Sequence, residues 1–196
     1  NAKESNYARS KLEGEKEIKS NFEKTTILRP SIVYSVDDNF TTNFMTLLRL
    51  LPFFPLYYNG KTKFTPIHCS ELTEIILQII DKNICSEIIE CVGPKEMTFK
   101  EILQKLLKLI DKKRLLIPMP LIVAKIMAKF FELFQKPLFT VDQLKLLKYD
   151  NILSGNYKSN SDIGYNCKLK FEEEVEKYCY MWREAGQYSK KDFKSN

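Results

Sequence analysis

Tyr7-Ala8-Arg9-Ser10-Lys11, with the helix and strand that follow it, is the stretch that decides the fold. Tyr7 and Lys11 lie four residues apart, so an α-helix places both side chains on one face, one turn apart. Apolar residues recur at helical spacing through residues 7–22, which predicts this helix. A tyrosine hydroxyl titrates at about pH 10, and a nearby ammonium favours its phenolate. Such a pair can exchange a proton with a carbonyl or an alcohol, and the ammonium can also bind a ribose.

The spacing of Tyr and Lys is uninformative alone, because the chain contains 10 Tyr and is rich in Lys. A second match, Tyr57 and Lys61, lies across the Asn59-Gly60 turn, where no helix aligns the two side chains. We interpret that match as coincidence. The first match gains its meaning from the sequence around it.

Beyond the helix, strands alternate with helices. We expect strands at 25–29, 87–92 and 115–117, extended segments at 31–34 and 64–69, and helices at 41–51, 70–80, 98–110, 120–135, 141–148 and 171–184. Thr41 or Thr42 and Ser70 are the predicted helix caps, and Thr98 with Glu101 and Thr140 with Gln143 form predicted capping boxes. Strands that alternate with helices of ten or more residues indicate a parallel, wound sheet, and the predominance of helices after residue 98 indicates a helical lobe.

Composition and charge exclude several classes of protein. Hydrophobic residues make up 44% and charged residues 29%, as in an ordinary globular protein. The net charge of +6 comes from lysines interspersed with Asp and Glu, which argues against nucleic-acid binding. Five Cys at wide spacing and a single His, His68, indicate neither a disulfide framework nor a metal site. The apolar segment 115–134 contains Pro and Lys, so we expect an amphipathic or core helix there and not a membrane span.

Four segments together resemble one protein family. Residues 5–15 resemble the active-site helix Y-x-x-S-K-x-x-G-E of extended and atypical short-chain dehydrogenases, and residues 27–34 resemble the strand I-L-R-P-x-x-V-[FY] that follows it. Residues 64–72 resemble F-x-P-V-H-V-x-D-V, and residues 89–103 resemble the last sheet strand and the next helix. Ser35 and Glu71 depart from the family, which usually has Gly and Asp there.

One branch of the family is similar over nearly the whole chain. Pro118-Met119-Pro120, residues 138–144 with Asp142-Gln143, and residues 147–151 with Asp150-Asn151 look like the NADPH-binding accessory subunits of respiratory complex I and their bacterial relatives. The resemblance implies an α/β fold: the C-terminal part of a Rossmann-type parallel sheet with a small, mostly helical lobe on the substrate side. We expect residues 1–97 to belong to the nucleotide-binding domain, with 41–63 reaching into the lobe, and residues 98–196 to form the lobe.

The resemblance also assigns roles to residues. Tyr7 would be the proton donor or acceptor, Lys11 would bind the ribose and tune the tyrosine, and Pro30, Ser31, Ile32 and Val33 would line the nicotinamide of NADP or NAD. No metal is implied. In the complex I branch the nucleotide is held structurally, so the pair does not by itself imply turnover.

The Gly-rich turn that holds the pyrophosphate is missing, since none of the six Gly lie in such a cluster. We therefore expect a chain that lacks the front half of its domain and binds NAD(P) weakly or not at all when alone. Either it pairs with a separate N-terminal-half polypeptide or with complex I, or it is a decayed remnant. We expect a cytoplasmic location, either free or peripheral at the inner face of a respiratory membrane. Two alternatives stay open: an active NAD(P)-dependent oxidoreductase or sugar-nucleotide epimerase or dehydratase, and a non-catalytic interaction or membrane-surface module.

Overall fold

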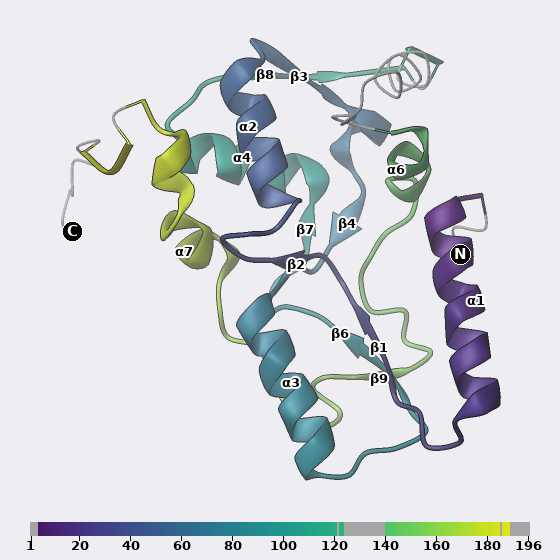
Figure 1. The fold of residues 1–196 in the computed structure, drawn as a ribbon. Coiled ribbons are helices and arrows are strands. Elements are labelled where there is room, and N and C mark those ends of the chain that lie inside the picture. The colour runs from purple at the N-terminus through teal and green to yellow at the C-terminus, as the bar shows by residue number, and fades with distance from the viewer. Residues whose placement is uncertain (1–3, 121, 124–139, 185, 189–196) are drawn as a thin grey trace.

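A computed structural model describes residues 4–120, 122–123, 140–184 and 186–188 (Figure 1). The α-helices are α1 (Asn6–Asn21), α2 (Thr41–Leu50), α3 (Cys69–Asp81), α4 (Phe99–Leu109), α6 (Val141–Leu146) and α7 (Phe171–Glu176). The strands are β1 (Ile27–Pro30), β2 (Val33–Tyr34), β3 (Phe53–Leu56), β4 (Lys63–Phe64), β5 (Ile67–His68), β6 (Ile88–Cys91), β7 (Met97–Thr98), β8 (Leu115–Pro118) and β9 (Lys158–Ser159). Short 3-10 helices are η1 (Tyr57–Gly60), η2 (Cys179–Trp182) and η3 (Gly186–Tyr188).

The predicted parallel sheet is present. Its strand order is β1-β6-β9, and both pairs are parallel, with Ile27 opposite Ile88 and Ile89 opposite Lys158. The helices α1 and α3 lie on opposite sides of this sheet in Figure 1. Ile75 and Ile79 of α3 pack with Ile89 in one buried cluster, whereas α1 buries none of its residues. One side of the sheet is therefore covered by the apolar face of α3. On the other side, α1 contacts the sheet through the ion pair of Glu15 with Arg29.

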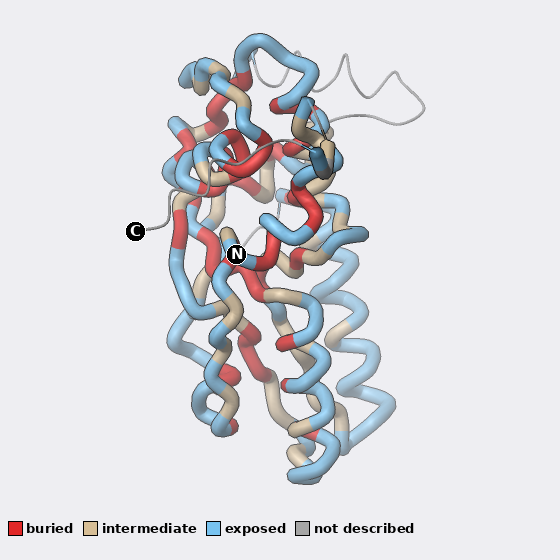
Figure 2. The backbone as a smooth tube through the Cα atoms, turned by 90° about the vertical axis from the view of Figure 1, so that its left-hand side faces the viewer, coloured by how far each residue is buried: buried red, intermediate tan, exposed pale blue. Residues whose placement is uncertain are grey.

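A larger buried cluster lies in the lobe above the sheet. It combines α2, α4 and α7 with the parallel pair β3 and β8. Figure 2 shows the buried backbone gathered in this lobe and along the strands beneath it. Ile102, Leu103 and Leu106 of α4 are fully buried and point one face of the helix into the cluster, as its helical spacing predicts. The lobe thus has a core of its own.

Two short strand pairs connect the sheet to the lobe. β2 pairs with β5 in parallel, and β4 pairs with β7 in antiparallel. Gly93, just after β6, lies so close to the neighbouring chain that an added Cβ would stand 1.7 Å from the carbonyl oxygen of Pro66. The predicted Asn59-Gly60 turn is confirmed, since both residues have positive φ. The close approach of the backbones at Gly93 and Pro66 therefore fixes how the segment after β6 packs against the segment before β5.

Two predicted helix caps are wrong. The N–H groups of Phe40 and Thr41 donate to Oδ1 of Asp38, at 2.6 and 2.5 Å, so that carboxylate caps α2 and neither threonine does. α3 begins one residue earlier than Ser70, and its cap is His68, whose Nδ1 accepts the N–H of Ser70 at 3.3 Å. In both places the acceptor lies upstream of the residue with the highest capping preference.

Three further predictions changed or fall outside the described ranges. The last helix ends at Glu176 and not near residue 184, because Tyr178 turns inward to bond Thr41 and a 3-10 turn follows. The 154–168 loop contributes the short strand β9, which joins the sheet. The predicted helix at 120–135 lies mostly outside the described residues. Both predicted capping boxes are confirmed.

Candidate functional site

The helix that carries Tyr7 runs antiparallel to β1, so its N-terminal end lies at the carboxyl edge of the sheet (Figure 1). Arg29 of β1 fixes this arrangement through Glu15 of α1, with Nε to Oε1 at 2.9 Å and Nη2 to Oε2 at 2.6 Å. This bidentate bond raises the pKa of the Arg29 guanidinium, although burial opposes the rise. In open α/β sheets, ligands bind at this carboxyl edge. Tyr7 and residues 30–33 therefore share the edge where a nucleotide is expected.

Tyr7 and Lys11 lie together on an open face of α1. The Lys11 ammonium stands 5.6 Å from the centroid of the Tyr7 ring, the geometry of a cation–π contact one turn apart. The tyrosine side chain is exposed. Among the described residues, neither the phenol nor the ammonium has a hydrogen-bond partner. Both polar groups are therefore free to meet the hydroxyl groups of a ribose.

Residues 30–33 form a different kind of surface, because their polar groups are used internally. Ser31 is buried; its Oγ donates to the carbonyl of Asn151 at 2.8 Å and accepts the N–H of Thr65 at 3.2 Å. The carbonyl of Ile32 accepts the N–H of Ile67 at 2.9 Å. Among the described residues, no side-chain hydrogen bond joins this segment to Tyr7 or Lys11. Tyr7 and Lys11 thus share the carboxyl edge of the sheet with residues 30–33, but no side-chain hydrogen bond connects the two groups within the described part of the chain.

A third segment, residues 142–151, bridges those two groups. At one end, Asp142 accepts hydrogen bonds from the hydroxyl of Ser5 and from the N–H of Tyr7. At the other end, Asn151 accepts from Ser31 and donates to the carbonyl of Lys63 at 2.8 Å. Sequence reasoning found Asp142 and Asn151 only as marks of resemblance and gave them no role. The signal that could have found them is Asp and Asn on either side of a short helix, with Asp142 in its first turn and Asp150-Asn151 after its end.

The charge of Asp142 strengthens the contact between the 142–151 segment and α1. The pKa of Asp142 is lowered: burial acts to raise it, but the hydrogen bonds from Ser5 and from two backbone N–H groups, together with Lys145, outweigh burial. The carboxylate also lies at the N-terminal end of α1, where the helix dipole favours negative charge. Asp142 is therefore held as an anion.

The segment 64–72, singled out by its motif, has structural roles. His68 caps α3, and its ring stands 5.2 Å from that of Tyr34, edge on. Burial raises the pKa of the Tyr34 phenol well above its ordinary value. Glu71 is buried and accepts the N–H groups of Lys168 and Leu169 at 2.5 and 3.0 Å. The contacts of Glu71 join α3 to the segment that leads into α7.

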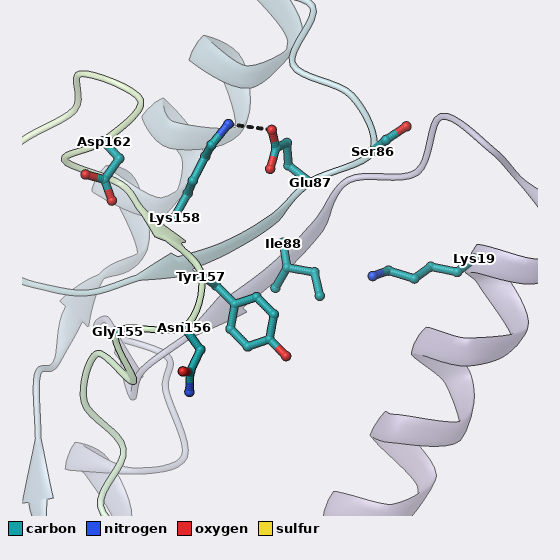
Figure 3. Close-up of a pocket in the computed structure, with 9 residues that line it drawn as sticks. All are labelled: Lys19, Ser86, Glu87, Ile88, Gly155, Asn156, Tyr157, Lys158 and Asp162. Carbon is teal, nitrogen blue, oxygen red and sulfur yellow. Dashed lines mark hydrogen bonds and ion pairs between the residues drawn. The ribbon is translucent and has the colours of Figure 1, made fainter.

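A cavity lies elsewhere, between the far end of α1 and the sheet (Figure 3). It has a volume of about 530 Å³, and Lys19, Ile88 and Tyr157 line it. Lys19 is about 18 Å further along the helix axis than Tyr7, at about 1.5 Å per residue. In Figure 3, Lys19 extends from α1 toward the strands, and Lys158 is bonded to Glu87. This open hollow is therefore not the predicted site.

Within the described ranges, no helix is both long and apolar enough to cross a bilayer. Across those same residues, no group of three or more His, Cys, Asp or Glu side chains is arranged to hold a metal ion.

Comparison with known proteins gives a consistent group of relatives. The 40 kDa subunit of mitochondrial NADH-ubiquinone oxidoreductase from Neurospora crassa is 26% identical over 164 residues, which is 82% of this chain and 42% of that protein. Subunit 9 of the NADH dehydrogenase [ubiquinone] 1 alpha subcomplex from Dictyostelium discoideum is 31% identical over 104 residues, 53% of this chain and 29% of that protein. The chain thus spans less than half the length of these relatives.

Solved structures share the fold at low identity. A UDP-N-acetylglucosamine 4-epimerase from Methanobrevibacter ruminantium M1 superposes with a TM-score of 0.59 at 14% identity, over 88% of this chain and 52% of that one. Human epimerase family protein SDR39U1, solved with NADPH, superposes with a TM-score of 0.58 at 17% identity, over 80% of this chain and 48% of that one. The predicted α/β fold class is confirmed by these likenesses.

The sequence profile of one family covers most of the chain. Residues 3–137 match the RmlD substrate binding domain. The fold of the chain and its relatives among complex I subunits agree with the family resemblance described from the sequence motifs. The chain therefore belongs to the RmlD substrate binding domain family.

Proposed function

We propose that this chain supplies the nicotinamide-binding half of an NAD(P) site in a subunit of the complex I type. Tyr7 and Lys11 would bind the ribose, and residues 30–33 would line the nicotinamide ring. One observation carries the proposal: a free phenol and a free ammonium, 5.6 Å from ring centroid to nitrogen, lie at the carboxyl edge of a parallel sheet. The 40 kDa relative from a respiratory complex supports the setting.

The role of the nucleotide in this proposal is structural. The ammonium and the phenol would hydrogen-bond the ribose hydroxyls. Because the Ser31 hydroxyl bonds to Asn151 and Thr65 within the chain, residues 30–33 would present a rigid backbone to the nicotinamide. Bound in this way, NADPH would stabilise the fold in proportion to its concentration over its dissociation constant. The dinucleotide would supply hydride chemistry if a substrate reached it.

The other half of the site would come from a Gly-rich strand, turn and helix. No Gly cluster exists in the 196 residues, so the pyrophosphate needs N–H groups from elsewhere. Two features support such a neighbour. In the sheet β1-β6-β9, β1 is an edge strand. The apolar side chains of Leu12 and Ile18 on α1, and of Phe22 at its C-cap, are exposed. The partner would be an N-terminal-half polypeptide, or a segment of the same protein that precedes residue 1.

The test combines the chain with a Gly-rich half, for which the part of the Neurospora relative outside the matched residues is the candidate, and measures NADPH binding by calorimetry. We expect binding by the pair and weak or no binding by the chain alone. Tyr7→Phe and Lys11→Met should each weaken binding about tenfold, since each removes one bond to the bound nucleotide. Lys61→Met, in the chance Tyr/Lys pair, is the matched control. Equal affinity for Lys11→Met and the control would contradict the proposal.

The same assembly separates the structural role from catalysis. A structural nucleotide is retained without turnover. Steady NADPH oxidation with a sugar nucleotide, lost in Tyr7→Phe, would instead favour the alternative of an oxidoreductase or epimerase, in which the phenol moves a proton.

A second proposal concerns contact with the respiratory membrane. Leu50, Phe53 and Leu115 are exposed at one end of the lobe, and Phe53 lies opposite Leu115 in the β3–β8 pair. Exposed Lys113 and Arg49 flank them. Apolar side chains beside basic ones suit an anionic lipid surface. We expect the chain to sediment with anionic but not neutral vesicles, and Leu115→Asp but not Ile80→Asp to abolish this; equal sedimentation of both variants would argue against it.

A further inference from the structure

The first turn of α1 completes its hydrogen bonds with a residue from the distant end of the chain. The first four N–H groups of a helix lack acceptors within the helix. The hydroxyl of Ser5, the N-cap, accepts one of these groups, the N–H of Ala8, at 3.3 Å. The N–H groups of Asn6 and Tyr7 donate to Asp142, at 2.9 Å to Oδ1 and 3.1 Å to Oδ2. The Ser5 hydroxyl donates to the same carboxylate at 2.8 Å, 137 positions away in sequence.

The carboxylate of Asp142 is itself held in place. It lies in the first turn of α6, whose capping box closes that turn. Leu144 of α6 is buried in the lobe cluster, and the hydroxyl of Thr62 donates to the carbonyl of Leu147. α1, by contrast, buries none of its residues. The lobe is therefore the fixed partner, and the N-terminal end of α1 takes its place from it.

We propose that Asp142 is a positioning residue for Tyr7, and that the 142–151 segment sets the spacing between the two halves of the nicotinamide site. Asp142 fixes the backbone N–H of Tyr7, and Asn151 fixes Ser31 through its carbonyl. One short segment thus bonds both groups of residues. The consequence for nucleotide binding rests on the proposed function; the positioning of the helix does not.

Two lysines lie near the contact between Asp142 and α1, so variants of Asp142 must separate the loss of charge from the loss of hydrogen-bond acceptors. Lys145 stands 3.9 Å from Oδ1 of Asp142, and Lys148 pairs with Glu4 just before α1. Asp142→Asn keeps one acceptor oxygen but loses the charge, whereas Asp142→Ala removes both acceptors. Asp162→Asn is the matched control, because Asp162 likewise accepts a backbone N–H, that of Ser159 at 2.7 Å, and takes no hydrogen bond from α1.

Amide hydrogen exchange on the 196-residue chain tests the positioning. In Asp142→Ala, protection of the Asn6 and Tyr7 amides should fall about five- to tenfold, the loss expected for a removed helix cap. In Asp142→Asn, protection of the two amides should lie between that in Asp142→Ala and that in the unsubstituted chain. In Asp162→Asn, protection of both amides should be unchanged. Unchanged protection at both amides in Asp142→Ala, or an equal loss across all helices, would overturn the inference.

NADPH affinity of the chain combined with the Gly-rich half supplies the second readout. We expect Asp142→Ala to weaken binding several-fold and the Asp162→Asn control to bind as the unsubstituted chain does. Equal affinity for all three overturns the positioning role for the site. If the unsubstituted assembly binds no NADPH, the proposed function fails, while the exchange measurement still decides whether Asp142 positions the helix.

Discussion

Single carboxylates hold the second half of this chain onto the first. Each accepts backbone N–H groups from a segment far away in sequence: Glu71 from Lys168 and Leu169, Glu90 from Ser154, Asp150 from Lys63, and Asp142 from Asn6 and Tyr7. Glu71 and Glu90 are themselves buried. Hydrogen bonds to a charged acceptor are stronger than those between neutral groups, so a few side chains suffice to hold loops that contribute little to either hydrophobic cluster.

Gly93 is the residue where side-chain size decides stability. Gly93→Ala would place a Cβ 1.7 Å from the Pro66 carbonyl oxygen, and the backbone on one side must move. We expect a loss of about 3 kcal/mol or more in the free energy of unfolding, the upper range for overpacking. Urea denaturation measures it.

Gly14 provides the control, because nothing lies within 4 Å of a Cβ added there, in the middle of α1. Gly14→Ala should stabilise the chain by about 0.5–1 kcal/mol. Two alanine variants with similar free energies of unfolding would show that the close approach at Gly93 is not rigid.

At the scale of elements, α4 shows how local sequence fixes one end of a helix. Thr98 accepts the N–H of Glu101, whose carboxylate accepts the Thr98 N–H at 2.7 Å. Thr98→Ala should cost about 1 kcal/mol, and Thr98→Ser should restore most of it.

The backbone and side-chain bonds to Thr98 lower the pKa of Glu101. A lowered folded-state pKa contributes stability above the unfolded value, and this contribution is lost as the pH falls through the folded value. We expect Glu101→Gln to flatten the stability profile below about pH 4.3, measured by urea denaturation across pH. An unaltered slope would mean that other carboxylates dominate there.

Elements that local signals define were predictable, and elements that depend on distant contacts were not. The α1, α3 and α4 helices and the β1 and β6 strands lie close to their predicted bounds, where the spacing of apolar residues puts them, and α4 also begins at its predicted capping box. The end of α7 could not be predicted, because Tyr178 leaves the helix to reach Thr41, 137 positions upstream. For the same reason the pair Tyr7 and Lys11 was visible in sequence, whereas the contact between Asp142 and α1 was not. The assignment of 1–97 and 98–196 to two domains, and the roles of Tyr7, Lys11 and 30–33, stay predictions.

At the scale of the whole molecule, one side of the sheet is less well covered than the other. α3 packs its apolar residues onto the sheet, while α1 buries none of its own and lies against β1 through the Arg29–Glu15 pair. In an open parallel sheet both faces are normally covered. The chain also spans 42% of the Neurospora relative. The proposed Gly-rich half would cover α1 and extend the sheet beyond β1.

The exposed apolar face of α1 therefore yields a prediction about assembly. Ile18 is 48% exposed on α1, and Ile80 is 66% exposed on α3, on the other side of the sheet. Ile18→Lys should abolish co-elution of the chain with the Gly-rich half in size-exclusion chromatography, because it places a charge where an apolar contact of about 25 cal/mol per Å² is expected. Ile80→Lys should leave co-elution intact, and neither change should alter the unfolding midpoint of the chain alone. If both variants co-elute fully, the Gly-rich half does not dock on α1, and the apolar side chains of that helix need another partner.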